Sequence, residues 1–364
     1  MNFNLSEEQS LIQESAREIA ENLSDLSAVD ALKNLAETDF LGLFFSEDAG
    51  GAGGDFLSYI VALQEIAKVS ASVALAYAVH CTQACYAIAA FAGSDLKKKY
   101  LPALFSGEKT AAYALGEGWR GKDLLNIEAR AVKADDEYII NGEKTFVYGG
   151  ASADIYIVFA KTDRGLSAFI VNHDTGGVAV SENYEKMGMD QITLNTVTFK
   201  NVHIPDVNII GNEESGDEIR QSVFNLHSIS LASIACGILT TAIEKTVTYG
   251  KERVQFNRPI LSFEAMSEKL GHMMIKAEAA RLLTFKAAAQ WDANDEAYVR
   301  SAYHARDFSM QSGEEICTAA IQMHGGYGYS KDLGVEALLR DIKGLSVFEN
   351  LTKPMVLMAA SADI

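Results

Sequence analysis

Two short stretches of the sequence have residue types whose spacing could support chemistry. The first is glycine-rich, residues 47–55 (EDAGGAGGD), of the kind that binds phosphate when it links a strand to a helix. No strand signal precedes it and no Lys-Ser or Lys-Thr pair follows it, so we expect a flexible loop between helices. The second is the pair Cys81 and Cys85, four apart on a predicted helix. No second Cys or His pair with metal-ligand spacing follows, so we expect core packing and no metal site.

Composition and charge limit the class of protein. The chain has 364 residues, 48% hydrophobic and 22% charged, which is ordinary for a soluble globular protein. Its net charge of −18 argues against nucleic-acid binding, which requires clustered Lys and Arg. We expect no membrane span, because no apolar run reaches the roughly 18–20 residues that a span needs. The start of the chain lacks a signal-peptide pattern and the four cysteines are scattered, so we expect a cytoplasmic protein.

Helical patterns occupy both ends of the chain. Ser6 and Gln9 have capping-box spacing, and alanine-rich helices are predicted over 57–68 and 71–92. After residue 217, long helices are predicted over 219–253, 263–292, 294–323 and 335–343. In the second of these, Leu270, Met273, Met274, Ala277 and Leu282 fall near one face, which we expect to be core.

Between these helical parts lie short segments rich in β-branched and aromatic residues. The predicted strands are 126–133, 137–140, 144–147, 154–161, 166–171, 177–181 and 193–200. Turn signals such as Asn141-Gly142 separate them, and the absence of intervening helical patterns disfavours a parallel Rossmann sheet. The sequence therefore predicts an α+β fold with an N-terminal helical domain (1–107), a central antiparallel β-domain (108–215) and a C-terminal helical bundle (216–364).

Three motifs follow one another along this framework. They are 112–123 (AYALGEGWRGKD), 253–260 (RVQFNRPI) and 322–329 (QMHGGYGY). Shorter fragments accompany them at matching spacings, namely 141–144 (NGEK), 186–188 (KMG), 339–341 (LRD) and 347–349 (VFE). In this order and spacing, the motifs resemble those of the acyl-CoA dehydrogenase family over nearly the whole chain. That family has the same order of helices, β-domain and helical bundle.

The resemblance implies FAD-dependent α,β-dehydrogenation of an acyl thioester. A carboxylate base must remove the α-proton while the β-hydride moves to flavin N5, and Glu349 occupies the position of the family's base. Glu117 is the rival carboxylate, but the family's matching Glu is structural. The positions that match cofactor contacts are Tyr113, Leu115, Gly116, Lys122, Phe146, Tyr148, Arg253, Phe256, Gln322, Gly325, Gly326 and Leu351.

Subunit partners are also implied by the resemblance. Arg253 and Gln322 match family residues that reach across a subunit interface to another chain's FAD, with Gly325 and Gly326 allowing close backbone approach. A homotetramer or dimer of dimers is therefore expected, and electron-transfer flavoprotein is the electron acceptor that the family suggests.

Several positions depart from the family pattern. Gly116 replaces a flavin-bonding Thr, Tyr148 stands where a Thr donates to flavin N5, and Leu351 replaces another Thr. Lys122 replaces a Ser and could compensate by pairing with the pyrophosphate. On the thioester side, Asn225 and Ser228 replace the Asp and Arg that contact CoA, and 190–194 (DQITL) replaces Arg-x-Ser-x-Thr.

These departures leave three functions open. The first is a FAD dehydrogenase whose acyl substrate is carried by CoA or, given the lost CoA contacts, by an acyl carrier protein. The second is a non-catalytic or half-site partner subunit of a heteromeric acyl-CoA dehydrogenase, in which Arg253 and Gln322 serve a neighbour's flavin. The third is a flavin oxidase or monooxygenase relative.

Overall fold

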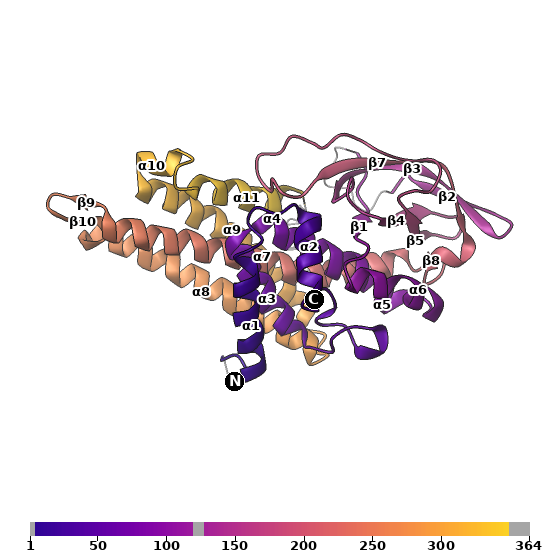
Figure 1. Cartoon of the computed structure of the whole chain (residues 1–364), viewed down its shortest axis with the longest axis horizontal. Helices are drawn as coiled ribbons and strands as arrows, with labels where there is room; N and C mark the ends of the chain where they lie inside the picture. The colour runs from indigo at the N-terminus through magenta and orange to yellow at the C-terminus, as the bar shows by residue number, and fades with distance from the viewer. Residues whose placement is uncertain (1–3, 119–126, 349–364) are drawn as a thin grey trace, which may run out of the picture.

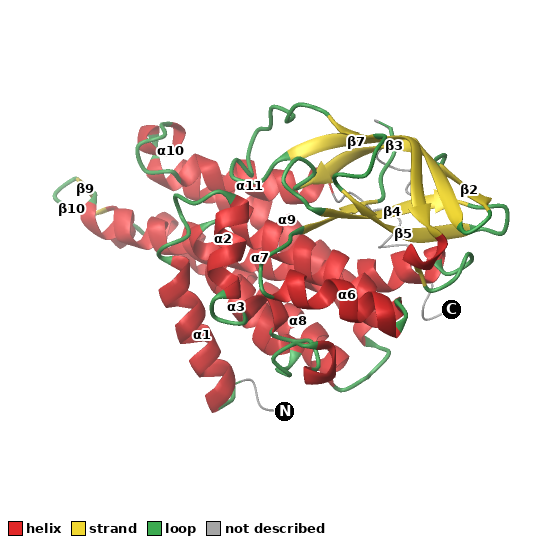
Figure 2. Ribbon diagram, turned by 45° about the vertical axis from the view of Figure 1, so that its right-hand side comes forward, coloured by secondary structure: helices red, strands yellow, loops and turns green. Residues whose placement is uncertain are grey.

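The computed structural model describes residues 4–118 and 127–348. A β-domain forms one end of the molecule, and long helices extend from it to the opposite end (Figures 1 and 2). The N-terminal helices are α1 (Glu7–Ala20), α2 (Ala28–Ala36), α3 (Phe56–Val69), α4 (Ala71–Ala78), α5 (Tyr86–Phe91) and α6 (Ser94–Phe105). The C-terminal helices are α7 (Gly216–Glu252), α8 (Glu264–Asp292), α9 (Tyr298–His324), α10 (Gly326–Tyr329) and α11 (Val335–Phe348). The predicted α+β class is confirmed.

Local signals set several helix boundaries. The predicted capping box is present, because the Ser6 hydroxyl accepts from the Gln9 N–H and the Gln9 side chain accepts from the Ser6 N–H. The helix predicted over 71–92 is interrupted by a π-helical segment, Val79–Cys85 (η3). All four cysteines are buried free thiols, as expected for core packing. No group of three His, Cys, Asp or Glu side chains suited to a metal occurs in the described part of the chain.

The glycine-rich stretch is a folded loop and has no phosphate-binding geometry. Its backbone N–H groups from Gly51 to Gly54 donate to the carbonyl oxygens of Ser46, Gly42, Phe45 and Leu43. Because these amides are already bonded, they are not available to a phosphate. The loop we expected is confirmed, but its backbone is fixed by its own hydrogen bonds.

Eight strands form one sheet. They are β1 (Ala111–Ala114), β2 (Arg130–Ala134), β3 (Glu137–Tyr148), β4 (Ile155–Lys161), β5 (Leu166–Asn172), β6 (Val178–Val180), β7 (Leu194–Pro205) and β8 (Ile209–Ile210). The order is β6-β7-β3-β2-β4-β5-β8, with β1 paired to β4. Most pairings are antiparallel, as predicted, whereas β1 and one residue of β2 pair with β4 in parallel.

The predicted turn at Asn141-Gly142 is wrong. Both residues lie inside β3, which continues past them through a register shift between Ile140 and Gly142. A Cβ on Gly142 would lie 2.5 Å from the Cβ of Ala129, so the glycine permits a close approach of two backbones. Gly142 is therefore explained by close packing within a strand, and it does not mark a turn.

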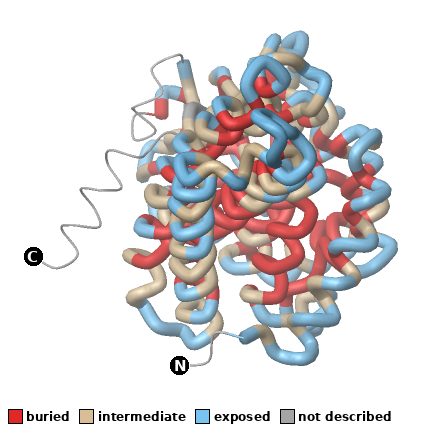
Figure 3. Tube along the Cα trace, turned by 90° about the vertical axis from the view of Figure 1, so that its left-hand side faces the viewer, coloured by how far each residue is buried: buried red, intermediate tan, exposed pale blue. Residues whose placement is uncertain are grey.

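Helix α7 is the centre of the helical part. Its residues from Asn225 to Leu239 are buried without interruption, behind the exposed helices that Figure 3 shows at the surface. Contrary to our expectation, two helical stretches, Ala71–Phe91 and Gly216–Glu252, are long and apolar enough to cross a membrane. In each, 83% of the apolar window is buried inside the protein, as in core helices.

Gln191 joins the β-domain to the N-terminal helices. Its side-chain amide donates to the carbonyl oxygens of Ser24 and Leu26, both at 2.8 Å, and its side-chain oxygen accepts from the Ser70 hydroxyl. Its own carbonyl accepts from the Ala28 N–H at 3.3 Å. One side chain thus ties the loop before β7 to the α1–α2 connection and to the start of α4.

Replacing Gln191 should loosen this junction. We expect Gln191→Leu to lower the free energy of unfolding by about 2 kcal/mol, because it removes several hydrogen bonds and leaves partly buried partners unsatisfied. Urea unfolding would measure the change. The matched variant Gln311→Leu, at an exposed position on α9, should change it by less than about 0.5 kcal/mol. Equal effects of the two substitutions would contradict the assignment.

Candidate active site

The first motif begins in β1 and is fixed by an ion pair between Lys144 and Glu117. Lys144 is 0% exposed, and its Nζ lies 2.5 Å from Oε1 of Glu117. The Glu117 carboxylate also accepts from the backbone N–H groups of Glu128 and Ala129, at 2.5 and 3.1 Å. Burial lowers the pKa of Lys144 to about 8, opposed by the Glu117 charge. Glu117 is thus bonded within the protein, which agrees with a structural role and disfavours it as the base.

Strand β3 carries further motif residues and places them beside the first motif. Phe146 sits at an irregularity of β3 with φ +55°, and its ring centroid lies 5.4 Å from that of Tyr184. Tyr113 on β1 packs edge-on against Phe159, with centroids 5.1 Å apart. The Thr145 N–H donates to the Gly116 carbonyl, which joins β3 to the loop after β1. The structure therefore brings Tyr113, Leu115, Gly116 and Phe146 to one edge of the β-domain.

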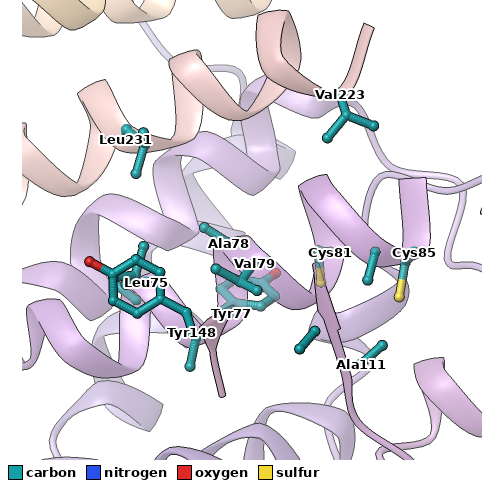
Figure 4. Close-up of a cluster of buried hydrophobic side chains, with 14 of the residues drawn as sticks. Leu75, Tyr77, Ala78, Val79, Cys81, Cys85, Ala111, Tyr148, Val223 and Leu231 are labelled. Atoms are coloured by element: carbon teal, nitrogen blue, oxygen red, sulfur yellow. The ribbon is translucent and has the colours of Figure 1, made fainter. Parts of the chain in front are cut away.

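Tyr148 lies deeper than the other motif residues. It is 5% exposed, and its ring lies in the apolar cluster formed by α4, η3, β1 and α7 (Figure 4). With Val29 of α2 and Ile192 it lines a small gap of about 20 Å³. Its side chain therefore faces the junction between the N-terminal helices and the β-domain.

The remaining motif residues gather at the opposite end of the molecule. Arg253, Gln322, Gly325 and Gly326 line one hollow of about 630 Å³, next to the hairpin β9 (Val254–Gln255) and β10 (Arg258–Pro259). A Cβ added to either Gly325 or Gly326 would meet no atom within 4 Å, so this backbone is open to an approaching group. Phe256 stands at the hairpin tip, 88% exposed.

The residues at the edge of the β-domain (the first set) and those around the hollow beside the hairpin (the second set) are far apart within one chain. Helix α7 begins at Gly216 against Leu166 of β5 and ends immediately before Arg253. Its 37 residues span roughly 55 Å at about 1.5 Å per residue. Figure 1 shows the β-domain and the hairpin at opposite ends. A single bound molecule cannot contact both sets in the same chain.

The face of α8 that we expected to be core is only partly buried. Met273 is buried, whereas Met274 is 53% exposed and the adjacent Ile275 is 67% exposed. That part of the expectation is wrong, because an apolar stripe in the sequence does not identify the surface that covers it.

Three candidate residues, Lys122, Glu349 and Leu351, lie outside the described part of the chain. Helix α11, which ends immediately before Glu349, is held by the loop at 186–189. The Asp341 carboxylate accepts from the Met189 N–H at 2.7 Å, and the Arg340 guanidinium donates to the Met187 carbonyl at 2.8 Å. A Cβ on Gly188 would lie 2.6 Å from the Arg340 backbone. Two short fragments of the resemblance, KMG and LRD, are therefore in direct contact.

A buried polar group on α9, not predicted from the sequence, faces α7. The Asn225 side-chain oxygen accepts from the Tyr303 hydroxyl at 2.6 Å and from Gln221 at 2.8 Å. Arg306, one turn after Tyr303, is 4% exposed, with its guanidinium 5.3 Å from the Phe224 ring centroid. Burial and the Arg306 charge lower the pKa of His227 to about 3. The signal available in the sequence was Arg306, a charged residue at a core position of the α9 helical pattern.

Comparison with known proteins agrees with this architecture. The acyl-CoA dehydrogenase N-terminal domain matches residues 6–108, the middle domain matches 112–202 and the C-terminal domain matches 214–349. The chain belongs to the acyl-CoA dehydrogenase family. Members of this family are flavin oxidoreductases that act on CH–CH groups.

Relatives and solved structures match over nearly the full length. An acyl-CoA dehydrogenase of Bacillus subtilis is 37% identical over 341 residues, covering 92% of this chain and 89% of the relative. The structure of butyryl-CoA dehydrogenase from Megasphaera elsdenii superposes with a TM-score of 0.95 at 32% identity, covering 100% and 99% of the two chains. The prolyl acyl carrier protein oxidase AnaB superposes with a TM-score of 0.94 at 25% identity, covering 99% of each chain.

His80 connects the helices to the strand that carries the first acyl-CoA dehydrogenase motif. It is fully buried on η3, its Nε2 donates to the Leu104 carbonyl at 3.0 Å, and its Nδ1 accepts from the Ala111 N–H at 3.3 Å. Burial lowers its pKa to about 4. Only the neutral ring satisfies both bonds, because Nδ1 must accept.

Because of His80, the free energy of unfolding should decrease as the pH is lowered. Between pH 6.5 and about 4 the unfolded chain binds a proton at His80 that the folded chain does not. The contribution of His80 to the free energy of unfolding is therefore complete above pH 6.5. It is lost as the pH falls, by up to about 1.4 kcal/mol per pH unit. Urea unfolding at pH 7.5, 6 and 5 should show a smaller decline for His80→Gln than for the wild type. His272→Gln, at an exposed position, should keep the wild-type slope. An unchanged slope in His80→Gln would contradict this role.

Proposed function

We propose that this protein is a FAD-dependent dehydrogenase that converts an acyl thioester to its α,β-unsaturated form. The observation that carries the proposal is the assembly of Tyr113, Leu115, Gly116 and Phe146 at one edge of the β-domain, within the family's fold. FAD would supply the hydride acceptor at N5. The compartment is proposed to be the cytoplasm.

The described residues fit the two halves of this cofactor. The backbone N–H groups of Gly116 and Glu117 make no hydrogen bond with any described residue, so they can donate to the flavin end. Arg253 and the open backbone at Gly325 and Gly326 suit the pyrophosphate and adenosine end, where a guanidinium binds phosphate well. Phe256 and Gln322 contribute to this second set, while Lys122, Tyr148 and Leu351 are proposed to complete the first.

Glu349 is the proposed base. It removes the proton from Cα, the hydride leaves Cβ for the cofactor, and the electron pair of the broken Cα–H bond forms the new double bond. Glu117 cannot replace it, since its carboxylate is held by Lys144 and two backbone N–H groups.

The carrier of the acyl group is proposed to be CoA or an acyl carrier protein. Asn225 is already bonded to Tyr303 and Gln221, and the Ser228 hydroxyl donates to the Phe224 carbonyl of its own helix. Neither residue therefore reproduces the charged pair that contacts CoA in the family. A carrier protein presents the same phosphopantetheine thioester without the nucleotide, and electron-transfer flavoprotein is the proposed acceptor of the electrons.

Substitution of Glu349 tests the reaction. Glu349→Gln keeps size and hydrogen bonding but cannot accept the proton, so we expect the variant to bind FAD as the wild type does and to fail to bleach the flavin anaerobically. Stopped-flow absorbance with the same acyl group on CoA and on carrier protein would measure this and rank the carriers. Flavin reduction by Glu349→Gln at the wild-type rate would place the base elsewhere. A wild-type flavin that reduces and then reoxidises rapidly with O₂ would favour an oxidase.

A second subunit is proposed to complete each cofactor site, because the two sets of residues lie at opposite ends of the chain. Arg253→Ala should weaken FAD binding by more than about tenfold while leaving the fold unchanged, since Arg253 is exposed. Arg164→Ala, in the exposed β4–β5 turn, is the matched control. Fluorescence titration and sedimentation would measure binding and assembly. A monomer that holds one FAD per chain would exclude the proposal, whereas a chain without flavin until co-expressed with a different subunit would indicate a half-site partner.

A further inference from the structure

We propose that Lys144 is a positioning residue for cofactor binding, which aims two backbone N–H groups of the first motif at FAD. This inference rests on the proposed function, because FAD is the ligand. Lys144 itself is buried under the motif and contacts only protein atoms among the described residues, namely the Leu115 carbonyl at 3.2 Å and the Glu117 carboxylate. Its effect on the cofactor must therefore pass through the loop that it holds.

The direction of the loop carbonyls determines the direction of the N–H groups. Lys144 binds the Leu115 carbonyl, and the Thr145 N–H donates to the Gly116 carbonyl at 2.9 Å, so both carbonyls point toward β3. In a trans peptide the C=O and the following N–H point in opposite directions. The N–H groups of Gly116 and Glu117 consequently point away from β3. Both residues are partly exposed, and neither N–H donates to another described residue.

Glu117 fixes the other side of this loop. Its carboxylate accepts hydrogen bonds from the N–H groups of Glu128 and Ala129, just before β2, and from the Lys144 ammonium group. Only 12% of the Glu117 side chain is exposed, so loss of its cationic partner would destabilise the carboxylate, and the loop would rearrange to bring it to water. Lys144 thus orients the Leu115–Gly116 peptide unit directly, and through the Glu117 side chain it supports the Gly116–Glu117 unit, which the Thr145 N–H also holds.

This orientation matters more here than in a chain with a hydroxyl at the same position. Gly116 has no side chain, so the loop offers the cofactor only backbone donors at this point. Two adjacent N–H groups that point the same way form a concave receptor for an acceptor-rich group. The carbonyl oxygens and N1 of the flavin pyrimidine ring are acceptors of this kind.

The test compares Lys144→Met with Lys133→Met, a matched change at an exposed position on β2. We expect Lys144→Met to raise the Kd for FAD by at least about tenfold, since two donors lose their alignment. At saturating FAD, its visible flavin band should shift toward that of free FAD. Hydrogen exchange of the FAD-free protein should accelerate at the N–H groups of Glu128, Ala129 and Thr145, which donate to the Glu117 carboxylate and the Gly116 carbonyl, but not in β4, β5 or β7. Lys133→Met should match the wild type in all three measurements.

The outcomes separate the possible explanations. A folded Lys144→Met with wild-type affinity and spectrum would overturn the inference, and so would accelerated exchange throughout the β-domain, which would indicate a merely structural role. If Lys144→Met does not fold, Glu117→Gln removes the charge but keeps the shape, and the same three readouts apply to it. If the wild type binds no FAD, the proposed function fails, while exchange at the N–H groups of Glu128, Ala129 and Thr145 still shows whether Lys144 orients the loop.

Discussion

Burial of α7 is the constraint on which the other elements depend. From Asn225 to Leu239 every side of this helix is covered, and its apolar residues include Leu226, Ile229, Leu231 and Ile238. Each such side chain contributes about 1.5–3 kcal/mol when fully removed from water. One helix that is apolar all round requires neighbours all round, which here are α3, α8, α9 and α11. Its length also sets the separation between the β-domain and the hairpin, and hence between the two sets of residues proposed to bind the cofactor.

Backbone strain is concentrated in or beside the segments that carry the family motifs. Most residues other than glycine with positive φ are Asp or Asn, which tolerate this conformation. The three bulky exceptions are Phe146 at +55°, Met189 at +58° and Phe256 at +50°. Each lies in or beside a family motif and costs on the order of 1–3 kcal/mol. Phe146 and Met189 are held by surrounding contacts, whereas Phe256 is exposed and its conformation is set by the hairpin together with Asn257 at +64°.

The loop from Lys186 to Gln191 connects the three regions of the chain. At one end Asp341 and Arg340 bind its backbone, and at the other Gln191 reaches the α1–α2 connection. Burial raises the pKa of Asp341, and the Met189 N–H and the Arg340 charge oppose this shift. The position of α11, and with it the chain that leads to Glu349, is therefore tied to the β-domain through polar contacts.

The sequence by itself determined the elements whose signals are local. Helix periods, the Ser6 capping box, the β-rich middle region and the motifs are encoded in neighbouring residues, and the fold class and family followed from them. Tertiary structure alone decided what depends on distant partners. The continuity of β3 through Gly142 depends on Ala129, and the π-helix at η3 lies among buried neighbours. The Lys144–Glu117 pair joins two residues 27 positions apart that only the fold brings together. The burial of Tyr148 and the exposure of Met274 also depend on tertiary structure, because a residue's type does not state which surface will cover it.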